Sequence, residues 1–177
     1  MSTTFLLFTP ITETDTMNPE ITTRPVDLLG HKMLLTSEGD SLIRCKWMLS
    51  DPDSSVYSYA DKKNEVIEKA VLQISEYLAG LRKDFSVPLQ LEGTEFRLKV
   101  WNEMRKIPYG ETITYRELAQ RIGSPTAYRA VANACGANPF PILIPCHRVV
   151  ASGGKTGGYT GGIDIKKALL EIENKNT

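Results

Sequence analysis

Residues 138–150 read Asn138-Pro139-Phe140-Pro141-Ile142-Leu143-Ile144-Pro145-Cys146-His147-Arg148-Val149-Val150. Prolines frame three consecutive large aliphatic residues, and this pattern predicts an extended segment buried in a core. A cysteine, a histidine and an arginine follow without a spacer, and neighbours of this kind form and hold thiolates. A buried cysteine that acts as a small hydrophobe is the alternative. The adjacent His147 and Arg148 favour a reactive Cys146.

The overall composition limits the class of protein. The 177 residues are 41% hydrophobic and 24% charged, which is enough for a core without disulfides. The three cysteines have no framework spacing, so we expect free thiols in a reducing compartment. The two histidines lie far apart and no Cys-x-x-Cys pair exists, so we expect no metal. The apolar run at residues 5–8 is too short for a secretory signal, and no run suits a membrane span. An intracellular protein, cytoplasmic or nuclear, is expected.

The net charge of zero conceals an uneven distribution. Residues 1–93 hold nine basic and 14 acidic side chains, whereas residues 94–177 hold twelve basic and seven acidic ones. This difference favours two domains, of which the C-terminal one suits a polyanion. Ordinary surface variation is the alternative. We expect an irregular extension at 1–22, an N-terminal α/β domain at 23–92 and a C-terminal domain at 93–177.

Short alternating segments predict three antiparallel strands near the N-terminus, at residues 26–29, 32–36 and 41–47. A polar loop at 50–60 precedes a helix over 64–81, in which apolar residues repeat at helical spacing. Residues 85–91 alternate as an edge strand that contains Pro88. Cys45 lies on the third strand, and we interpret it as structural.

The C-terminal half predicts four helices. Thr94 caps the first, which ends before Pro108, and Thr114 with Glu117 forms a capping box for the second. Ser124 and Pro125 open a third, alanine-rich helix that ends at Gly136, and the last covers 164–173. The middle pair forms a helix-turn-helix pattern, for which simple packing in the core is the alternative. The whole chain therefore predicts an α+β fold.

A glycine-rich loop covers residues 152–162 and surrounds Tyr159 and Thr160. Part of it is similar to a phosphate-binding loop, but the upstream glycine of that motif falls on Val149, which excludes it. We expect instead a loop whose backbone approaches a ligand closely.

Two motifs carry a resemblance to a known family. Pro145-Cys146-His147-Arg148-Val149, with Asn138-Pro139 before it and Tyr159-Thr160-Gly161-Gly162 after it, resembles the O6-alkylguanine-DNA alkyltransferases (methylated-DNA–protein-cysteine methyltransferases). The likeness covers about residues 94–173 closely. It implies a ribonuclease H-like N-terminal domain and a winged helix-turn-helix-like domain at 93–177 for DNA binding and alkyl transfer. It also implies double-stranded DNA containing O6-alkylguanine as the partner, no cofactor, no membrane contact and a monomer.

The resemblance implies roles for the reactive stretch. Cys146 would be the nucleophile, His147 would act as a base through a water molecule, and Glu173 would orient His147. Neighbouring side chains on an extended segment point to opposite faces, so we expect no direct contact between His147 and the Cys146 sulfur. Arg148 is expected to be structural.

The resemblance also implies how the damaged base is held. Tyr115 would hydrogen-bond N3 of the guanine and help the leaving base to accept a proton. Backbone groups of Cys146, Val149 and Thr160 would read the base, with Pro141 and Tyr159 lining its pocket. Relatives usually have serine at the Thr160 position, and the extra methyl group bears on the tolerance for bulky alkyl groups.

For DNA, the resemblance implies that the alanine-rich helix lies in the minor groove. Arg129 matches the family's arginine finger, which fills the gap left when the damaged nucleotide rotates out of the stack. Ala130 and Ala134 are the small residues expected nearest the DNA. Asn138 would tie the helix-turn-helix to the active-site turn.

The leading hypothesis is direct-reversal DNA repair. An alkyl group passes once and irreversibly from O6 of guanine, less readily from O4 of thymine, to Cys146. A Cys-His hydrolase is one alternative, but it needs an oxyanion hole that the sequence does not place. A helix-turn-helix module that recognises damaged DNA without reacting is the other.

Overall fold

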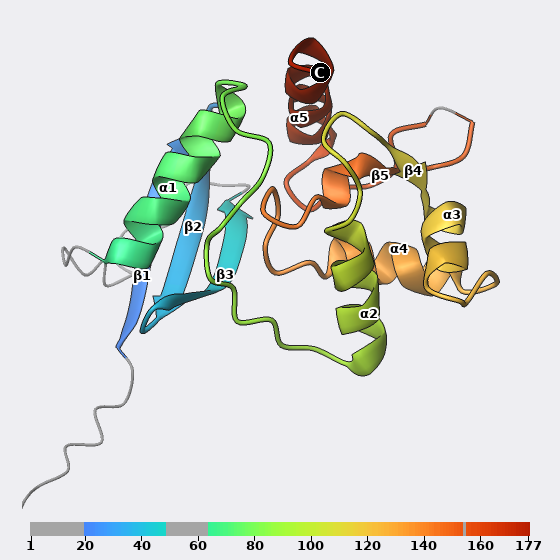
Figure 1. Cartoon of the computed structure of the whole chain (residues 1–177), viewed down its shortest axis with the longest axis horizontal. Helices are drawn as coiled ribbons and strands as arrows, with labels where there is room; N and C mark the ends of the chain where they lie inside the picture. Colours follow the sequence, from blue (N-terminus) through green and yellow to red (C-terminus); the bar gives the residue numbers. More distant parts are fainter. Residues whose placement is uncertain (1–19, 49–63, 154) are drawn as a thin grey trace, which may run out of the picture.

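The computed structural model describes residues 20–48, 64–153 and 155–177 (Figure 1). Most of the expected extension at 1–22, and the expected polar loop at 50–60, lie outside these ranges. Ile21 and Thr22, which were expected in the extension, belong to the first strand. None of the described helices is long and apolar enough to cross a membrane.

The N-terminal part holds a three-stranded antiparallel sheet in the order β1-β2-β3, which confirms the predicted hairpins. Its strands are β1 Ile21–Leu28, β2 His31–Glu38 and β3 Ser41–Met48. Leu29 and Gly30 join β1 to β2 with φ angles of 53° and 75°. Two positive φ angles are typical of the tight hairpin turns whose twist matches that of the flanking strands.

Helix α1, Glu65–Leu78, covers one face of this sheet (Figure 1). It begins where the Asn64 side chain accepts a hydrogen bond from the Ile67 N–H, and it ends shortly before Gly80. The predicted apolar stripe is the buried face, so the helix prediction is confirmed. Its buried residues are Val66, Ile67, Ala70, Gln73, Ile74 and Tyr77.

The expected edge strand at residues 85–91 does not form as such. Only Leu89 pairs, in an isolated parallel bridge with Leu42. The Leu42 N–H donates to the Pro88 carbonyl at 2.9 Å, and the Gln90 N–H donates to the Leu42 carbonyl at 2.8 Å. Pro88 has no N–H to donate to a ladder, which limits the pairing to this bridge.

The C-terminal part is mainly helical, and this confirms the α+β class (Figure 1). Thr94 caps its first helix, and Thr114 with Glu117 forms the predicted capping box. The two short strands pair in parallel. The elements are α2 Glu95–Met104, β4 Ile113–Thr114, α3 Tyr115–Arg121, α4 Tyr128–Gly136, β5 Val149–Val150 and α5 Ile163–Lys175.

Helices α3 and α4 pack against each other as the helix-turn-helix pattern predicts. The expected start of α4 at Ser124 and Pro125 is wrong. The Ala127 N–H donates to the Ser124 carbonyl at 2.9 Å, which closes a turn before the helix. Helix α4 begins at Tyr128 without a side-chain cap, and Gly136 is its last residue.

One hydrophobic cluster runs through both parts of the described chain. Cys45 is buried in it, and burial raises the pKa of this thiol, in keeping with a structural residue. The Cys45 N–H donates to the Pro139 carbonyl at 2.7 Å. The sheet is therefore attached directly to the start of the reactive stretch.

Candidate active site

The reactive stretch is a closed turn, so the predicted extended segment is wrong. The Asn138 amide donates to the Ile144 carbonyl at 2.8 Å, and its oxygen accepts from the Phe140 N–H at 3.0 Å. Ile142 lies inside this turn with a φ of 74°, which is unfavourable for a β-branched residue. Asn138, two residues after the end of α4, is thus hydrogen-bonded to the segment before Cys146.

Cys146 begins a short 3-10 helix, Cys146–Arg148. Successive residues of such a helix are about 120° apart, so Cys146 and His147 point in different directions without lying on opposite faces. The Cys146 side chain, 5% exposed, faces a cavity of about 330 Å³. That cavity is lined by Tyr115, Ala132, Asn133, Cys135, Gly136, Cys146, Gly158, Tyr159 and Thr160.

Cys146 rests as a thiol. Burial raises its pKa above the ordinary value, and this effect exceeds the opposing ones. A hydrogen bond from Asn138, the charge of Lys166 and the N–H groups of Cys146 and His147 all act to lower the pKa. These groups are arranged to stabilise a thiolate once a base removes the proton.

His147 is fully buried beside that thiol and is held by two oxygens. Its Nε2 atom lies 2.9 Å from Glu173 Oε1 and 3.1 Å from the Tyr77 hydroxyl. A carboxylate can only accept hydrogen bonds, so Nε2 carries the proton and Nδ1 is the basic nitrogen. Nδ1 has no hydrogen-bond partner among the described residues. Burial lowers the His147 pKa, so the ring rests neutral and can accept a proton.

Glu173 is buried and stays ionised. Its oxygens accept from Arg148 Nε at 3.0 and 3.1 Å and from the Gly110 N–H at 2.9 Å. Burial alone would raise its pKa, but hydrogen bonds from His147, Arg148 and Tyr77 lower the pKa to about 2. Arg148 also donates to the Ile107 carbonyl, which agrees with its expected structural role.

Lys166 is a charged group of this site that the sequence analysis did not identify. Its side chain is fully buried, and Nζ donates to the Val149 carbonyl at 2.6 Å and to the Gly158 carbonyl at 3.4 Å. Burial lowers its pKa, whereas Cys146 acts to raise it. The sequence offered one signal for its burial, because Lys166 directly follows Ile165, a residue on the inward face of α5.

The remaining cavity wall comes from Tyr115 and the glycine-rich loop. Burial raises the pKa of Tyr115 to about 12, so its hydroxyl is protonated at neutral pH. Trp47 Nε1 donates to the Tyr159 hydroxyl at 3.4 Å. A Cβ atom on Gly157 would lie 2.9 Å from the Tyr115 hydroxyl, and one on Gly161 would lie 2.6 Å from Trp47. The glycines therefore allow the backbone to approach protein aromatic rings.

Two residues expected around the base do not line the cavity. Pro141 is buried within the turn that Asn138 closes. The Val149 side chain is also buried, and its carbonyl accepts a hydrogen bond from Lys166. A carbonyl has two lone pairs, so this oxygen can still accept one further hydrogen bond.

Helix α4 presents Arg129 and Ala130 to solvent, but Ala134 faces the core and is 3% exposed. The expectation that Ala134 lies nearest the DNA is therefore wrong. Four residues advance an α-helix by about 40° more than a full turn, which carries Ala134 to the buried side. Tyr128 lies on the exposed side, and the guanidinium groups of Arg116 and Arg129 lie 5.8 and 5.9 Å from its ring centre.

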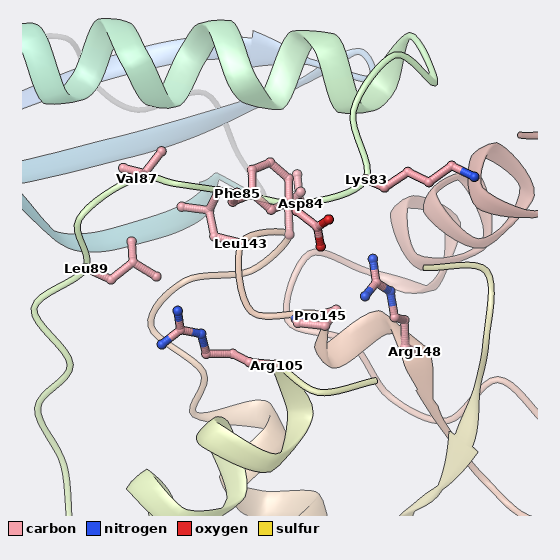
Figure 2. Close-up of a pocket in the computed structure, with 10 residues that line it drawn as sticks. Lys83, Asp84, Phe85, Val87, Leu89, Arg105, Leu143, Pro145 and Arg148 are labelled. Atoms are coloured by element: carbon pink, nitrogen blue, oxygen red, sulfur yellow. The ribbon is translucent and has the colours of Figure 1, made fainter. Parts of the chain in front are cut away.

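A second cavity, of about 200 Å³, is lined by Pro145 and Arg148 but by neither Cys146 nor His147. Figure 2 shows that Lys83, Phe85 and the residues after them lie along the other side of this cavity. The segment that follows α1 thus packs against the reactive stretch.

Comparisons with known proteins show the family to which the chain is similar. Residues 95–175 match the family described as 6-O-methylguanine DNA methyltransferase, DNA binding domain. The methylated-DNA–protein-cysteine methyltransferase of Methanosarcina acetivorans is 45% identical over 133 residues, 75% of this chain and 82% of that protein. The crystal structure of Mycobacterium tuberculosis O6-methylguanine methyltransferase is 38% identical, with a TM-score of 0.79 over 89% of this chain and 95% of that one. Mycobacterium tuberculosis OGT in complex with DNA, also 38% identical, matches with a TM-score of 0.78 over 88% and 94%.

Proposed function

The chain belongs to the methylated-DNA–protein-cysteine methyltransferase family, and we propose that it transfers alkyl groups from O6-alkylguanine in double-stranded DNA irreversibly to Cys146. The chain is accordingly a DNA-repair methyltransferase that binds DNA. The position of Cys146 is the observation that supports its role as the nucleophile. Its thiol faces the cavity, and His147, the next residue, belongs to a buried network with Glu173.

Cys135 lines the same cavity and is the competing thiol. Its sulfur donates to the Met104 sulfur at 3.5 Å, and burial raises its pKa to about 12. Lys166 and one backbone N–H group act to lower the pKa of Cys135, whereas for Cys146 the Asn138 side chain and a second backbone N–H group add to such effects. Cys146 is therefore the better nucleophile of the two.

The reaction is a direct displacement. The thiol proton of Cys146 passes to Nδ1 of His147 through one water molecule. The sulfur then forms a bond to the alkyl carbon as the bond from that carbon to O6 breaks. The electron pair of the broken bond stays with the guanine. Tyr115, which is protonated at neutral pH, donates a hydrogen bond to N3 of the leaving base, and the base takes up the proton that the Cys146 thiol released. Thymine alkylated at O4 is a poorer substrate in this account.

The product explains single turnover. The alkyl group ends in a thioether, whose carbon–sulfur bond is stable to water and to the side chains of the site. No cofactor enters the displacement, because it needs only a thiolate, a positioned electrophile and a leaving group that can be protonated. Each molecule is consumed by one reaction.

DNA binding is assigned to residues 93–177 of one chain acting as a monomer. The O6 atom cannot be attacked inside the base stack, so the nucleotide rotates into the cavity of Cys146. The exposed side of α4 supports this role, with Arg129 as the finger that fills the gap and Ala130 beside it. Phosphate contacts make such binding sensitive to salt and largely independent of sequence.

The cavity also bears on the choice of alkyl group. Thr160 is exposed and lines the cavity together with Tyr159. Its methyl group, which the serine of most relatives lacks, would narrow the space for the alkyl group. Backbone groups of Cys146, Val149 and Thr160 would read the base. We expect methyl groups to be transferred faster than bulky ones.

Intact-protein mass after incubation with O6-benzylguanine tests the proposal. One benzyl group per protein, on the peptide that contains Cys146, is expected, and Cys135→Ser should retain it while Cys146→Ser loses it. Repeated release of product without an adduct would indicate a hydrolase. Tight binding of damaged DNA with an unchanged mass would indicate a sensor that does not react.

A further inference from the structure

Tyr77 brings a hydroxyl group from the N-terminal part of the chain into the His147–Glu173 pair. It lies in the last turn of α1, and its side chain is fully buried. Its ring centre is 5.3 Å from that of Phe85, 5.7 Å from that of Tyr109 and 6.4 Å from that of His147. Ring packing alone would be served equally well by phenylalanine, so the hydroxyl needs a separate explanation.

This hydroxyl forms a closed triangle with two other polar atoms. Tyr77 donates to Glu173 Oε1 at 2.5 Å, the Tyr77 oxygen lies 3.1 Å from His147 Nε2, and Nε2 lies 2.9 Å from the same carboxylate oxygen. Burial, together with the nearby Glu173, raises the pKa of Tyr77, so the hydroxyl keeps its proton. That proton goes to Glu173, and the Tyr77 oxygen is left to accept from Nε2–H.

We propose that Tyr77 is a positioning residue for alkyl transfer: its hydroxyl shares the Glu173 oxygen used by His147 and helps Glu173 to hold the imidazole in the Nε2–H form. This inference rests on the proposed function only for its kinetic consequence. Nε2–H has two oxygen acceptors, one from α5 and one from α1, and neither comes from the reactive stretch. Nδ1 is thereby kept as the nitrogen that receives the thiol proton.

The hydroxyl also limits how strongly Glu173 acts on His147. The hydrogen bond from Tyr77 to Glu173 is the shortest of the three, so it takes part of the negative charge on Oε1. Without it, the charge on Oε1 is shared between His147 and Arg148 only, so more of it acts on His147 and favours the imidazolium. The charged groups that act on His147 are Glu173 and Lys166 from α5 and Arg148 from its own turn. Cys146 is the preceding residue, and Tyr109, from the loop before β4, packs against the Tyr77 ring. All of them stay in place when Tyr77 is replaced by phenylalanine.

This arrangement assigns the N-terminal part a role in the chemistry. Figure 1 shows α1 and α5 on opposite sides of the segment that follows α1, with the C-terminal end of α1 towards α5. The Tyr77–Glu173 hydrogen bond joins the two helices. The N-terminal part therefore contributes one atom, the Tyr77 hydroxyl oxygen, to the surroundings of His147, the proposed general base.

Histidine ¹⁵N NMR of Tyr77→Phe tests the inference without reference to activity. The chain has two histidines, His31 and His147, so the signals can be assigned with one His31→Gln variant. Wild type should show His147 as the Nε2–H form at neutral pH. Tyr77→Phe should shift the Nε2 signal of His147, because one of the two acceptors of Nε2–H is lost, and should move the His147 titration midpoint to higher pH. Identical spectra, or a midpoint at lower pH, would overturn the inference.

Kinetics with O6-benzylguanine give the second readout. Tyr77→Phe should lower the maximal rate of adduct formation by roughly tenfold, part of what general acid–base catalysis contributes, and shift the acid limb of the rate profile to higher pH. Tyr109→Phe is the matched control, because that hydroxyl makes no hydrogen bond to Tyr77, His147 or Glu173. It should leave the NMR spectrum and the rate profile unchanged. If wild type forms no adduct, the proposed function fails while the NMR result still decides the role of Tyr77.

Discussion

Lys166 Nζ lies 2.6 Å from the carbonyl oxygen of Val149, which places a fully buried ammonium group behind the backbone that follows Cys146. The contact fixes the position of Val149, and the charge helps to lower the pKa of the Cys146 thiol. A buried cation beside a thiol favours the thiolate, because an unpaired charge in a dry environment is costly and an opposite charge offsets that cost.

Lys166→Met keeps the length of the side chain but removes the charge. The pKa of Cys146 should rise, so the reaction of this thiol with iodoacetamide should require a higher pH than in wild type. Peptide-resolved mass spectrometry separates Cys146 from Cys45 and Cys135. An unchanged pH dependence at Cys146 would show that the lysine only supports the backbone.

Asn138→Ala should damage both the fold and the reaction. The change leaves the Phe140 N–H and the Ile144 carbonyl without their side-chain partner, at a cost of about 1–3 kcal/mol for each buried group. Cys146 also loses a hydrogen bond that favours its thiolate. The free energy of unfolding, measured in urea, and the rate of reaction with O6-benzylguanine should both fall. A free energy of unfolding equal to that of wild type would show that the Asn138 hydrogen bonds do not stabilise the turn.

Glu173 should make stability depend on pH in acid. Its pKa is about 2 in the folded chain and 4.5 ordinarily. Because the folded pKa is lower, the ionised carboxylate stabilises the fold above about pH 4.5, and this stabilisation is lost as the pH falls towards 2. Urea unfolding of wild type and Glu173→Gln at several pH values measures the effect as a difference.

The two proteins should differ most at neutral pH, by on the order of 3 kcal/mol, which is the cost of leaving a buried partner charge such as Arg148 unpaired. The difference should shrink steadily below pH 4.5. A constant difference across this range would show that the carboxylate charge does not stabilise the fold.

Local rules predicted much of this fold, because their causes lie within a few residues. The helix caps at Thr94 and Thr114 and the apolar stripe of α1 formed as expected. The turn before Cys146 was missed because its closure depends on one amide, Asn138, rather than on a pattern of apolar residues. The adjacent proline and aliphatic residues are equally compatible with an extended segment.

The candidate site was predicted only in part, because some of its contacts join residues that are far apart in the sequence. Cys146, Tyr115, Tyr159 and Thr160 do line one cavity. Tyr77 looked like an ordinary core aromatic, since its position in the stripe of α1 says nothing about the distant residue that its hydroxyl meets. Only the packing of α1 near α5 brings that hydroxyl to Glu173.

Arg129→Ala separates DNA handling from chemistry. The variant should lose most of its rate on duplex DNA that contains O6-methylguanine, yet react with the free base O6-benzylguanine as wild type does. Arg97→Ala, which removes an exposed cation from α2, controls for the general loss of positive charge. Equal losses on both substrates would contradict the finger role of Arg129.

The most direct measurement titrates the protein with a duplex that contains one O6-methylguanine and follows both products. Repaired guanine should rise to one equivalent per protein and stop there, and peptide mass spectrometry should place one methyl group on Cys146. Repair of more than one equivalent, or methylation of Cys135 in place of Cys146, would contradict the account.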